Sequence, residues 1–454
     1  MTPVLAVAAN LVKDLLRRRS TYALAALLVL SGSLLPGAGA DATGAREQLR
    51  LAVAYGMGLP AFLVALFTIV TSSGLAREIE SRRQQLLATK PIPAWKVIAG
   101  RLLGVLAADA ALLLLLLATL GFNVARIASS TGDPADFRLA QGRFFTPRGE
   151  VAPALPPLDK SAVKALVESL GREARAGHST GSASLDARAR VLLRSLRLAP
   201  GESGELAFPG LGRGAGAGGD EILPVRFVAH SLVPSEAARV TIEWLVLEPD
   251  GRGWRSIGVQ EAPHGVPAEV LVPATAVPVD GSLRLRVRNA SDPKSGVSLL
   301  LDPARARALP RRGSFAGSLV AVSWLLLVQW ALLAALGSCF GAFFRFPTAV
   351  LAGVFLHVTA LASGFLRETF ELFEDEPARG GLSERFAAWA SQFGGAVLNV
   401  LPDFSTLDPL DRLGAGRSFE ILELARETAV LLGLEALVAV AIGAIILGRR
   451  ELGR

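Results

Sequence analysis

Six apolar stretches separated by charged segments most constrain the fold of this chain. They lie near residues 20–38, 51–75, 102–123, 315–341, 347–366 and 427–447. A helix needs about 20 apolar residues to cross the roughly 30 Å of hydrocarbon in a bilayer. The composition agrees, because 51% of the 454 residues are hydrophobic and only 19% are charged. The sequence therefore predicts an α-helical polytopic membrane protein with six spans.

The first stretch admits a second interpretation, a cleaved signal peptide. Three arginines, Arg17 to Arg19, precede it, and Ala38, Gly39 and Ala40 resemble a cleavage site. An amphipathic segment, Val4 to Leu16, stands before the arginines, and a signal peptide rarely begins in this way. We therefore expect a retained span, and both interpretations place residue 45 outside.

Basic residues predict the orientation of the spans. They gather before the first span, between the second and third, between the fourth and fifth, and after the sixth. With six spans all these clusters lie on one side, which the positive-inside rule identifies as the cytoplasm. Both termini then lie in the cytoplasm, and residues 124–314 and 367–426 lie outside. The net charge of +7 needs no nucleic acid partner to explain it.

The polar insertion at residues 124–314 has the pattern of a separate α+β domain. Helical spacing over 159–176 and 185–198 predicts a helical part at about 159–198. Alternation with a period of two predicts strands at 222–229, 240–247, 253–259, 268–272, 282–288 and 297–301. Six short strands in close succession indicate a small antiparallel β-sandwich over about 222–302.

Three arginines alternate with apolar residues on one expected strand: Arg284, Arg286 and Arg288. Such a row could bind an anionic ligand or a periplasmic partner's carboxylates. It is also the pattern of a solvated strand face with scattered counter-charges, and we favour that interpretation. Trp244 and Trp254 lie on strands expected to pair, where core or cross-strand packing is favoured over stacking on a sugar.

Two carboxylates lie inside expected spans. Asp109 should cost about 2.5 to 3.5 kcal/mol at the centre of a bilayer, which the leucines that follow it offset in part. Glu435 in the last span poses the same question. Each could belong to a polar lining or proton relay, or could lie near an interface or pair with a neighbouring helix. We favour the second interpretation for both, and assign no role to His357 in the fifth span.

The segment between the second and third spans, residues 76–100, is the most informative. Residues 76–88 have the pattern of a charged helix with a small apolar patch formed by Ile79, Leu86 and Leu87. Two prolines then break it, and the chain restarts at Trp95. The pattern predicts a short, stiff cytoplasmic helix that another protein can bind. An ordinary positive-inside loop is the alternative.

This segment resembles the coupling segment of permease subunits of type-2 ATP-binding-cassette (ABC) exporters. The likeness rests on the acidic-basic helix, the Thr89-Lys90-Pro91 turn, and the restart through Gly100 and Arg101. Other features agree: the amphipathic N-terminal helix, the six spans with both ends inside, the stretch Leu401 to Gly416, and the closing Arg449 to Leu452. The likeness covers residues 1–123 and 315–454, and the large insertion departs from the family pattern.

The resemblance implies a permease subunit in the bacterial inner membrane, in contact with membrane lipid. It would pair with a second copy or a paralogue, and its coupling helix would dock on a separate ATPase subunit. The ATPase-contacting positions would be Arg77, Glu78, Glu80, Leu87 and Lys90. ATP and Mg would bind to that partner, because this chain has no G-x-x-x-x-G-K-[ST] motif.

Sequence patterns exclude several other kinds of site. The single cysteine, Cys339, excludes an intrachain disulfide, and the four histidines show no metal-ligand spacing. We expect no catalytic residues, no metal and no directly bound cofactor.

Three functions remain open. The first is ATP-driven export of an amphiphilic or polymeric substrate. The second is mechanotransmission, in which the outward domain works on a periplasmic partner and nothing crosses the bilayer. The third is a membrane-anchored receptor or scaffold that binds a ligand.

Overall fold

The computed structural model divides the chain into two compact units. We call them the helical unit (Met1–Pro147, Gly313–Thr369 and Phe393–Arg454) and the β unit (Arg148–Arg312 with Phe370–Gln392). The structure describes residues 2–34, 45–81, 93–130, 147–155, 163–164, 167–168, 195–211, 222–231, 239–248, 250–251, 253–278, 280–292, 297–312, 314–366, 404, 408–414 and 416–452.

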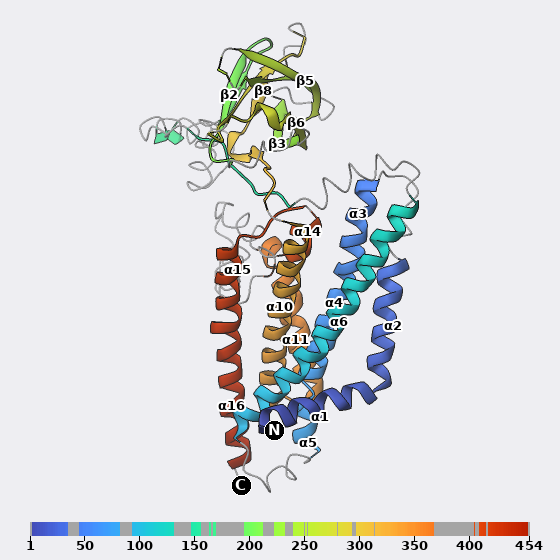
Figure 1. Cartoon of the computed structure of the whole chain (residues 1–454). Helices are drawn as coiled ribbons and strands as arrows, with labels where there is room; N and C mark the ends of the chain where they lie inside the picture. The colour runs from blue at the N-terminus through green and yellow to red at the C-terminus, as the bar shows by residue number, and fades with distance from the viewer. Residues whose placement is uncertain are drawn as a thin grey trace, which may run out of the picture. The chain divides into compact units, whose positions relative to one another are not determined.

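All six apolar stretches are helical over most of their described residues (Figure 1). The elements of the helical unit are α1 (Pro3–Arg17), α2 (Arg19–Leu34), α3 (Ala45–Val53), the π-helix η2 (Ala54–Gly58), α4 (Leu59–Ser72), α5 (Leu75–Glu80), α6 (Ala94–Ser130), α10 (Phe315–Phe343), α11 (Phe346–Leu361), α14 (Pro409–Gly414), α15 (Ile421–Thr428), the π-helix η7 (Ala429–Ala436) and α16 (Leu437–Leu452).

Among the described residues, 4 helices are long and apolar enough to cross a membrane: Leu51–Glu80, Ala94–Ser129, Phe315–Phe343 and Ile421–Arg450. The other two apolar helices, α2 and α11, are shorter. The six-span topology and the insertion into a membrane therefore stay predictions.

Several helices extend beyond the expected spans. The third apolar helix, α6, begins at Ala94 and runs to Ser130, well beyond both ends of the expected 102–123. The last begins at Ile421 inside the expected loop 367–426, which also contains the short helix α14. Apolar length marks the part of a helix that lipid can surround, whereas hydrogen bonding continues through the polar turns at each end.

The amphipathic N-terminal segment is helical as predicted. Its helix, α1, lies across the lower part of α6 in Figure 1, and its Leu11 and Leu15 are buried. Two glycines of α6 permit the close approach. A Cβ atom on Gly100 would lie 2.7 Å from the carbonyl oxygen of Val4, and one on Gly104 would lie 3.0 Å from that of Ala8.

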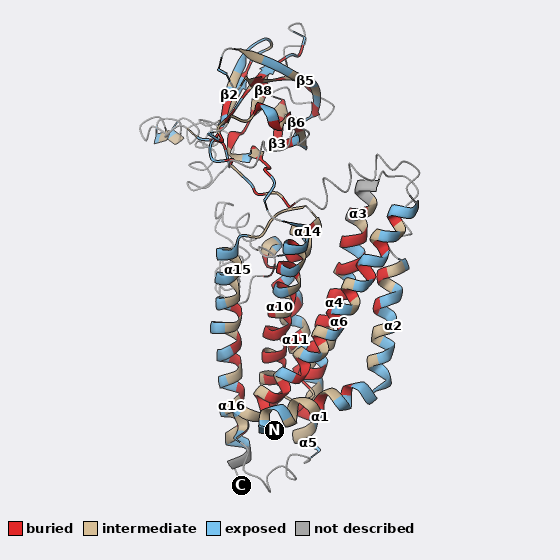
Figure 2. Cartoon of the chain, in the orientation of Figure 1, coloured by how far each residue is buried: buried red, intermediate tan, exposed pale blue. Residues whose placement is uncertain are grey.

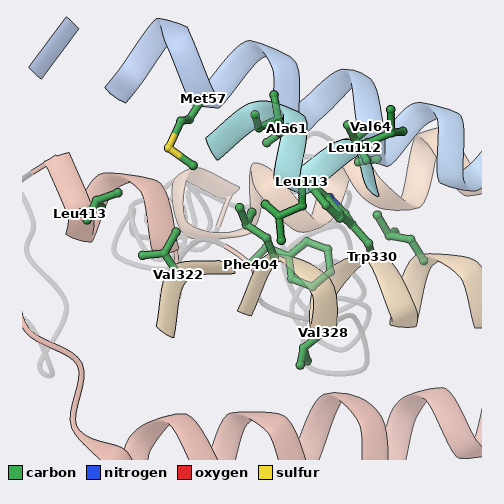
Figure 3. Packing of buried hydrophobic residues seen from close by; sticks show 14 of the residues in the cluster. Met57, Ala61, Val64, Leu112, Leu113, Val322, Val328, Trp330, Phe404 and Leu413 are labelled. Atoms are coloured by element: carbon green, nitrogen blue, oxygen red, sulfur yellow. The ribbon is translucent and has the colours of Figure 1, made fainter. Parts of the chain in front are cut away.

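A contiguous apolar core holds α4, α6 and α10 together. Figure 3 shows Val64 of α4, Leu112 of α6 and Trp330 of α10 in this cluster, together with Phe404. Figure 2 shows that α10 is the most buried of these helices, while α2 and α16 present much exposed surface. That surface is apolar, with Leu34 64% and Ile445 57% exposed. Large exposed apolar surfaces of this kind mark contact with a membrane or another protein.

The β unit contains two antiparallel sheets around one apolar core. One has the order β1-β8-β3-β6, with β9 also pairing with β3, and the other has the order β2-β7-β4-β5. The strands are β1 (Leu196–Leu198), β2 (Ser203–Phe208), β3 (Ile222–Ser231), β4 (Arg239–Leu247), β5 (Trp254–Pro263), β6 (Pro267–Pro273), β7 (Leu283–Asn289), β8 (Leu299–Leu301) and β9 (Arg307–Ala308).

The six expected strands are all present, which confirms the antiparallel β arrangement. The expected limits of about 222–302 were too narrow, because β1 and β2 precede them and β9 follows. The helical part expected at about 159–198 is wrong at its end, where β1 pairs with β8. The described residues farther forward, 163–164 and 167–168, are helical. At the turn after β4, Gly251 has a φ of +70°, which glycine adopts readily.

The two sheets share their side chains in one core. Phe227 of β3 and Trp244 of β4 lie on different sheets, and their ring centroids are 4.7 Å apart. Both side chains are fully buried. Trp244 is thus a core residue, as the favoured interpretation expected.

Candidate functional site

The expected coupling segment begins as a short helix at one end of the helical unit. Helix α5 continues α4 after a break at Ser73 and Gly74. In Figure 1, α1 and the end of α16 lie at the same end of the unit. Residues 82–92 lie outside the described residues, so the predicted helix is described only as far as Glu80 and Ser81.

An ion pair between a buried arginine and a partly exposed glutamate ties α5 to α6. A guanidinium nitrogen of Arg101 lies 2.5 Å from a carboxylate oxygen of Glu78, and another of its nitrogens donates to the carbonyl oxygen of Thr71 at 3.4 Å. The Arg101 side chain is 4% exposed, while that of Glu78 is 39% exposed. A charge as buried as Arg101 requires a partner. The pair therefore fixes the start of α6 to α5.

A small apolar cluster joins four helices at this end. It contains Leu75 of α5, Ile98 of α6, Ala342 of α10 and Leu447 of α16. Near it, Arg450 of α16 donates to the carbonyl oxygen of Phe343 at 2.8 Å. Movement of α5 would therefore be transmitted directly to the ends of α6, α10 and α16.

The proposed ATPase-contacting residues have different environments. The Arg77 guanidinium carbon lies 3.5 Å from the centroid of the Phe346 ring, a cation–π contact with α11. Glu78 faces Arg101, whereas Glu80 is exposed. Leu87 and Lys90 lie outside the described residues. Glu80 is exposed, and no ion pair with it is found among the described residues.

Asp109 lies inside the core of the helical unit. Its side chain is fully buried, and its Oδ1 atom lies 2.9 Å from the hydroxyl of Thr68 on α4. Its Oδ2 atom has no hydrogen-bond partner among the described residues. Asp109 thus pairs with a residue of a neighbouring helix, which is one of the two environments favoured from the sequence.

Glu435 and His357 of the helical unit also contain buried polar atoms without a hydrogen-bond partner among the described residues. Glu435 lies in the π-helix η7, and its Oε2 atom is buried without a partner among the described residues. His357 of α11 stacks on Phe62 at 5.5 Å between ring centroids and meets Phe404 at 6.1 Å. Neither of its ring nitrogens has a partner in the described part of the chain.

The arginines of β7 stand beside counter-charges. Arg286 lies 2.7 Å from Glu205 of β2, and Arg288 lies 3.4 Å from Glu243 of β4. The Arg286 guanidinium also lies 4.0 Å from the centroid of the Trp254 ring. Arg284 is exposed. This arrangement fits the favoured interpretation of a solvated strand face, and leaves little free charge for an anionic ligand.

Two histidines that are far apart in sequence meet in the β unit. The rings of His230 and His264 are 5.3 Å apart, edge to face, and the Ser231 backbone N–H donates to Nδ1 of His264 at 2.9 Å. Burial lowers the pKa of His230, and electrostatic repulsion from His264 and Arg305 lowers it further, while Asp302 opposes the shift. Sequence spacing did not reveal this pair, because the pairing depends on the turn between β5 and β6.

No group of three His, Cys, Asp or Glu side chains gathers as metal ligands among the described residues. Comparison with known proteins identifies no relative: no family model, no curated protein and no solved structure matches this chain. The resemblance to exporter permeases therefore rests on its sequence pattern alone.

Proposed function

We propose that this chain is the membrane permease subunit of an ATP-driven ABC transporter, with a separate ATPase subunit docking at the α5 end of the helical unit. The observation that supports this most is the attachment of α5. The pair Glu78–Arg101 and the apolar cluster around Leu75 connect it to three long helices. A partner that pulled on α5 would move those helices together, as coupling of ATP hydrolysis to a membrane unit requires.

The amphipathic helix α1 and the apolar exposed surfaces support the membrane part of the proposal. A helix with one apolar face suits the interface between lipid headgroups and acyl chains. Under this proposal the α5 end is cytoplasmic, the chain pairs with a second permease copy or a paralogue, and the β unit lies outside the bacterial inner membrane. The transported substrate would be amphiphilic or polymeric.

The test is co-purification of the full-length chain from its native membrane in mild detergent. We expect an ATPase polypeptide in the eluate, together with ATP hydrolysis. Glu80→Arg should remove the ATPase, because it reverses an exposed charge on the docking helix. Glu261→Arg is the control, since Glu261 is an exposed carboxylate of the β unit. An eluate of the unaltered chain without any ATPase would refute the proposal.

Mechanotransmission is the second candidate, and the construction of the β unit favours it. The two ends of this unit are joined, because Arg148 pairs with Arg311 and Val151 with Ala308 in antiparallel bridges. The unit also has a core of its own. Such a body can be moved as a whole by the membrane part.

The same joined ends allow a clean deletion. Residues 148–312 can be replaced by a short Gly-Ser linker, since paired antiparallel residues lie only about 5 Å apart. If the protein is an exporter, ATP-dependent substrate movement in vesicles should survive. If it is a mechanotransmitter, ATP hydrolysis should persist while the action on the periplasmic partner is lost.

A further inference from the structure

The hydrogen bonds around Thr68 require a proton that the Thr68 hydroxyl does not supply. Its oxygen lies 2.9 Å from the carbonyl oxygen of Val64 and 2.9 Å from Oδ1 of Asp109. Both neighbours are acceptors when Asp109 is ionised, yet a hydroxyl has a single hydrogen to donate. With an ionised Asp109, one of these two close contacts would lack a hydrogen.

A proton on Asp109 satisfies the whole group. The carboxylic acid then donates to Thr68, and the Thr68 hydroxyl donates to the Val64 carbonyl oxygen one helical turn away. The second carboxyl oxygen of Asp109, which has no described partner, becomes an uncharged carbonyl oxygen. Leaving such an oxygen unpaired costs about 1 to 3 kcal/mol, whereas an unpaired ionised carboxylate costs far more.

No described cation replaces this proton. Arg101, two turns along α6 from Asp109, is occupied by Glu78. Helix α4 contains no ionisable residue, and α10 contains only Cys339. Other charged or titratable groups with described side chains on elements that pack against α6 or α4 are Lys13, Asp14 and Arg17 of α1, Arg19 and Tyr22 of α2, Tyr55 of η2, His357 of α11, and Arg449 and Arg450 of α16. Arg77, Glu78 and Glu80 of α5 and Glu435 of η7 lie on elements that pack against α10. None of them forms an ion pair with Asp109 among the described residues.

We propose that Asp109 is a proton-binding site within the helical unit, with Thr68 as the acceptor of its hydrogen bond. The ligand is a proton, and the site is independent of any ATPase partner. A buried, uncharged carboxyl group between two apolar helices can take up or release charge when those helices move apart.

A series of polar groups leads from this site toward the α5 end. Ser72, one turn beyond Thr68, donates to the Thr68 carbonyl oxygen at 2.7 Å. A Cβ atom on Gly337 of α10 would lie 2.0 Å from the Ser72 hydroxyl, so α10 passes close to it. The next residue, Ser338, has a buried hydroxyl without a described partner. Arg101 and the partly exposed Glu78 lie farther along, at the α5 end of the unit.

Dicyclohexylcarbodiimide tests the site, because it modifies protonated carboxyl groups in apolar surroundings. The acid proton moves to a carbodiimide nitrogen and the carboxylate oxygen adds to the central carbon. Rearrangement then gives a stable N-acylurea, so the peptide gains the mass of the whole reagent. At about pH 8, where ordinary carboxyl groups are ionised, mass spectrometry of the full-length chain in detergent should find the adduct on Asp109.

Infrared spectroscopy provides a readout that does not depend on reagent access. Asp109→Asn should remove a carbonyl band of a protonated carboxylic acid, and Thr68→Val should shift that band because its hydrogen bond is lost. Glu435→Gln is the matched control, and should leave the Asp109 band in place. Identical spectra of the unaltered chain and Asp109→Asn in this region would show an ionised Asp109 and overturn the proposal.

Salt distinguishes a proton from a metal cation at the same carboxyl group. Labelling of Asp109 should be the same in sodium chloride and in choline chloride. Protection by sodium alone would overturn the proposal in favour of a sodium site.

Discussion

In the β unit, the arginines of β7 stand at the surface beside glutamates of neighbouring strands, whereas in the helical unit Asp109 is fully buried without a described cation. The difference follows from the side chains that each unit exposes. Water solvates an exposed ion pair, so the β unit keeps its charges outside and its core dry. The helical unit exposes apolar side chains, and its polar groups therefore gather between helices.

The largest expected loss of stability comes from removing a large side chain from the apolar core of the β unit. Trp244→Ala should destabilise that unit by about 3 to 5 kcal/mol, because it removes a fully buried indole that contacts Phe227. Hydrogen exchange of β4 and β7 in the full-length chain should report the loss. Trp254→Ala is the control, since Trp254 is only half-buried. Equal effects of the two substitutions would contradict this placement of the core.

The helical unit should be most sensitive where two helices approach closely. Gly100→Leu should destabilise it by about 1 to 3 kcal/mol, because a Cβ atom there would lie 2.7 Å from the Val4 carbonyl oxygen. Gly121→Leu on the same helix is the control, since nothing lies within 4 Å of its Cβ position. The measurement is thermal unfolding in detergent. If Gly121→Leu lowered the midpoint as much, α1 would not pack on α6 as described.

The two units also differ in how far sequence could predict them. The apolar stretches predicted the helices, and alternation predicted six strands, because both depend on residues close in sequence. The short strands β1, β2 and β9 escaped notice. Residues 196–198 fitted a helical spacing, yet pairing with β8, about a hundred residues later, makes them a strand. Contacts across such separations leave no local pattern.

The candidate sites show the same limit. The carboxyl of Asp109 in an apolar stretch could be recognised from sequence, but its partner Thr68 could not, because 41 residues separate the two. The arginine row on β7 was recognised as well. Its counter-charges, Glu205 and Glu243, became apparent only when the strand order placed β2 and β4 on either side of β7.

An exposed ion pair in the β unit should contribute little. Arg286→Ala should destabilise the unit by about 0.2 to 1 kcal/mol, since it removes a partly exposed pair with Glu205 and the contact with Trp254. A double-mutant cycle with Glu205→Ala would measure the coupling between the two residues. Arg284→Ala, on the same strand face, should have a smaller effect. A coupling energy comparable to the loss from Trp244→Ala would show that this charge is not solvated.

Acidification should produce the smallest effect, at the histidine pair. Burial, with repulsion from His264 and Arg305, lowers the pKa of His230, so the unfolded chain binds a proton more tightly than the folded chain. Stability is therefore greatest above the ordinary histidine pKa of about 6.5. It falls as the pH drops below that value, until the lowered pKa of the folded unit is reached.

Hydrogen exchange at β3 and β8, compared between about pH 7 and about pH 5, measures this acid sensitivity once the intrinsic exchange rates are corrected for pH. His230→Gln should flatten the pH dependence and leave Trp244 buried. The helical unit supplies the contrast, because the proton on Asp109 is already bound at neutral pH under our proposal. Mild acidification should thus loosen the strands around His230 while the packing of α4 against α6 stays unchanged.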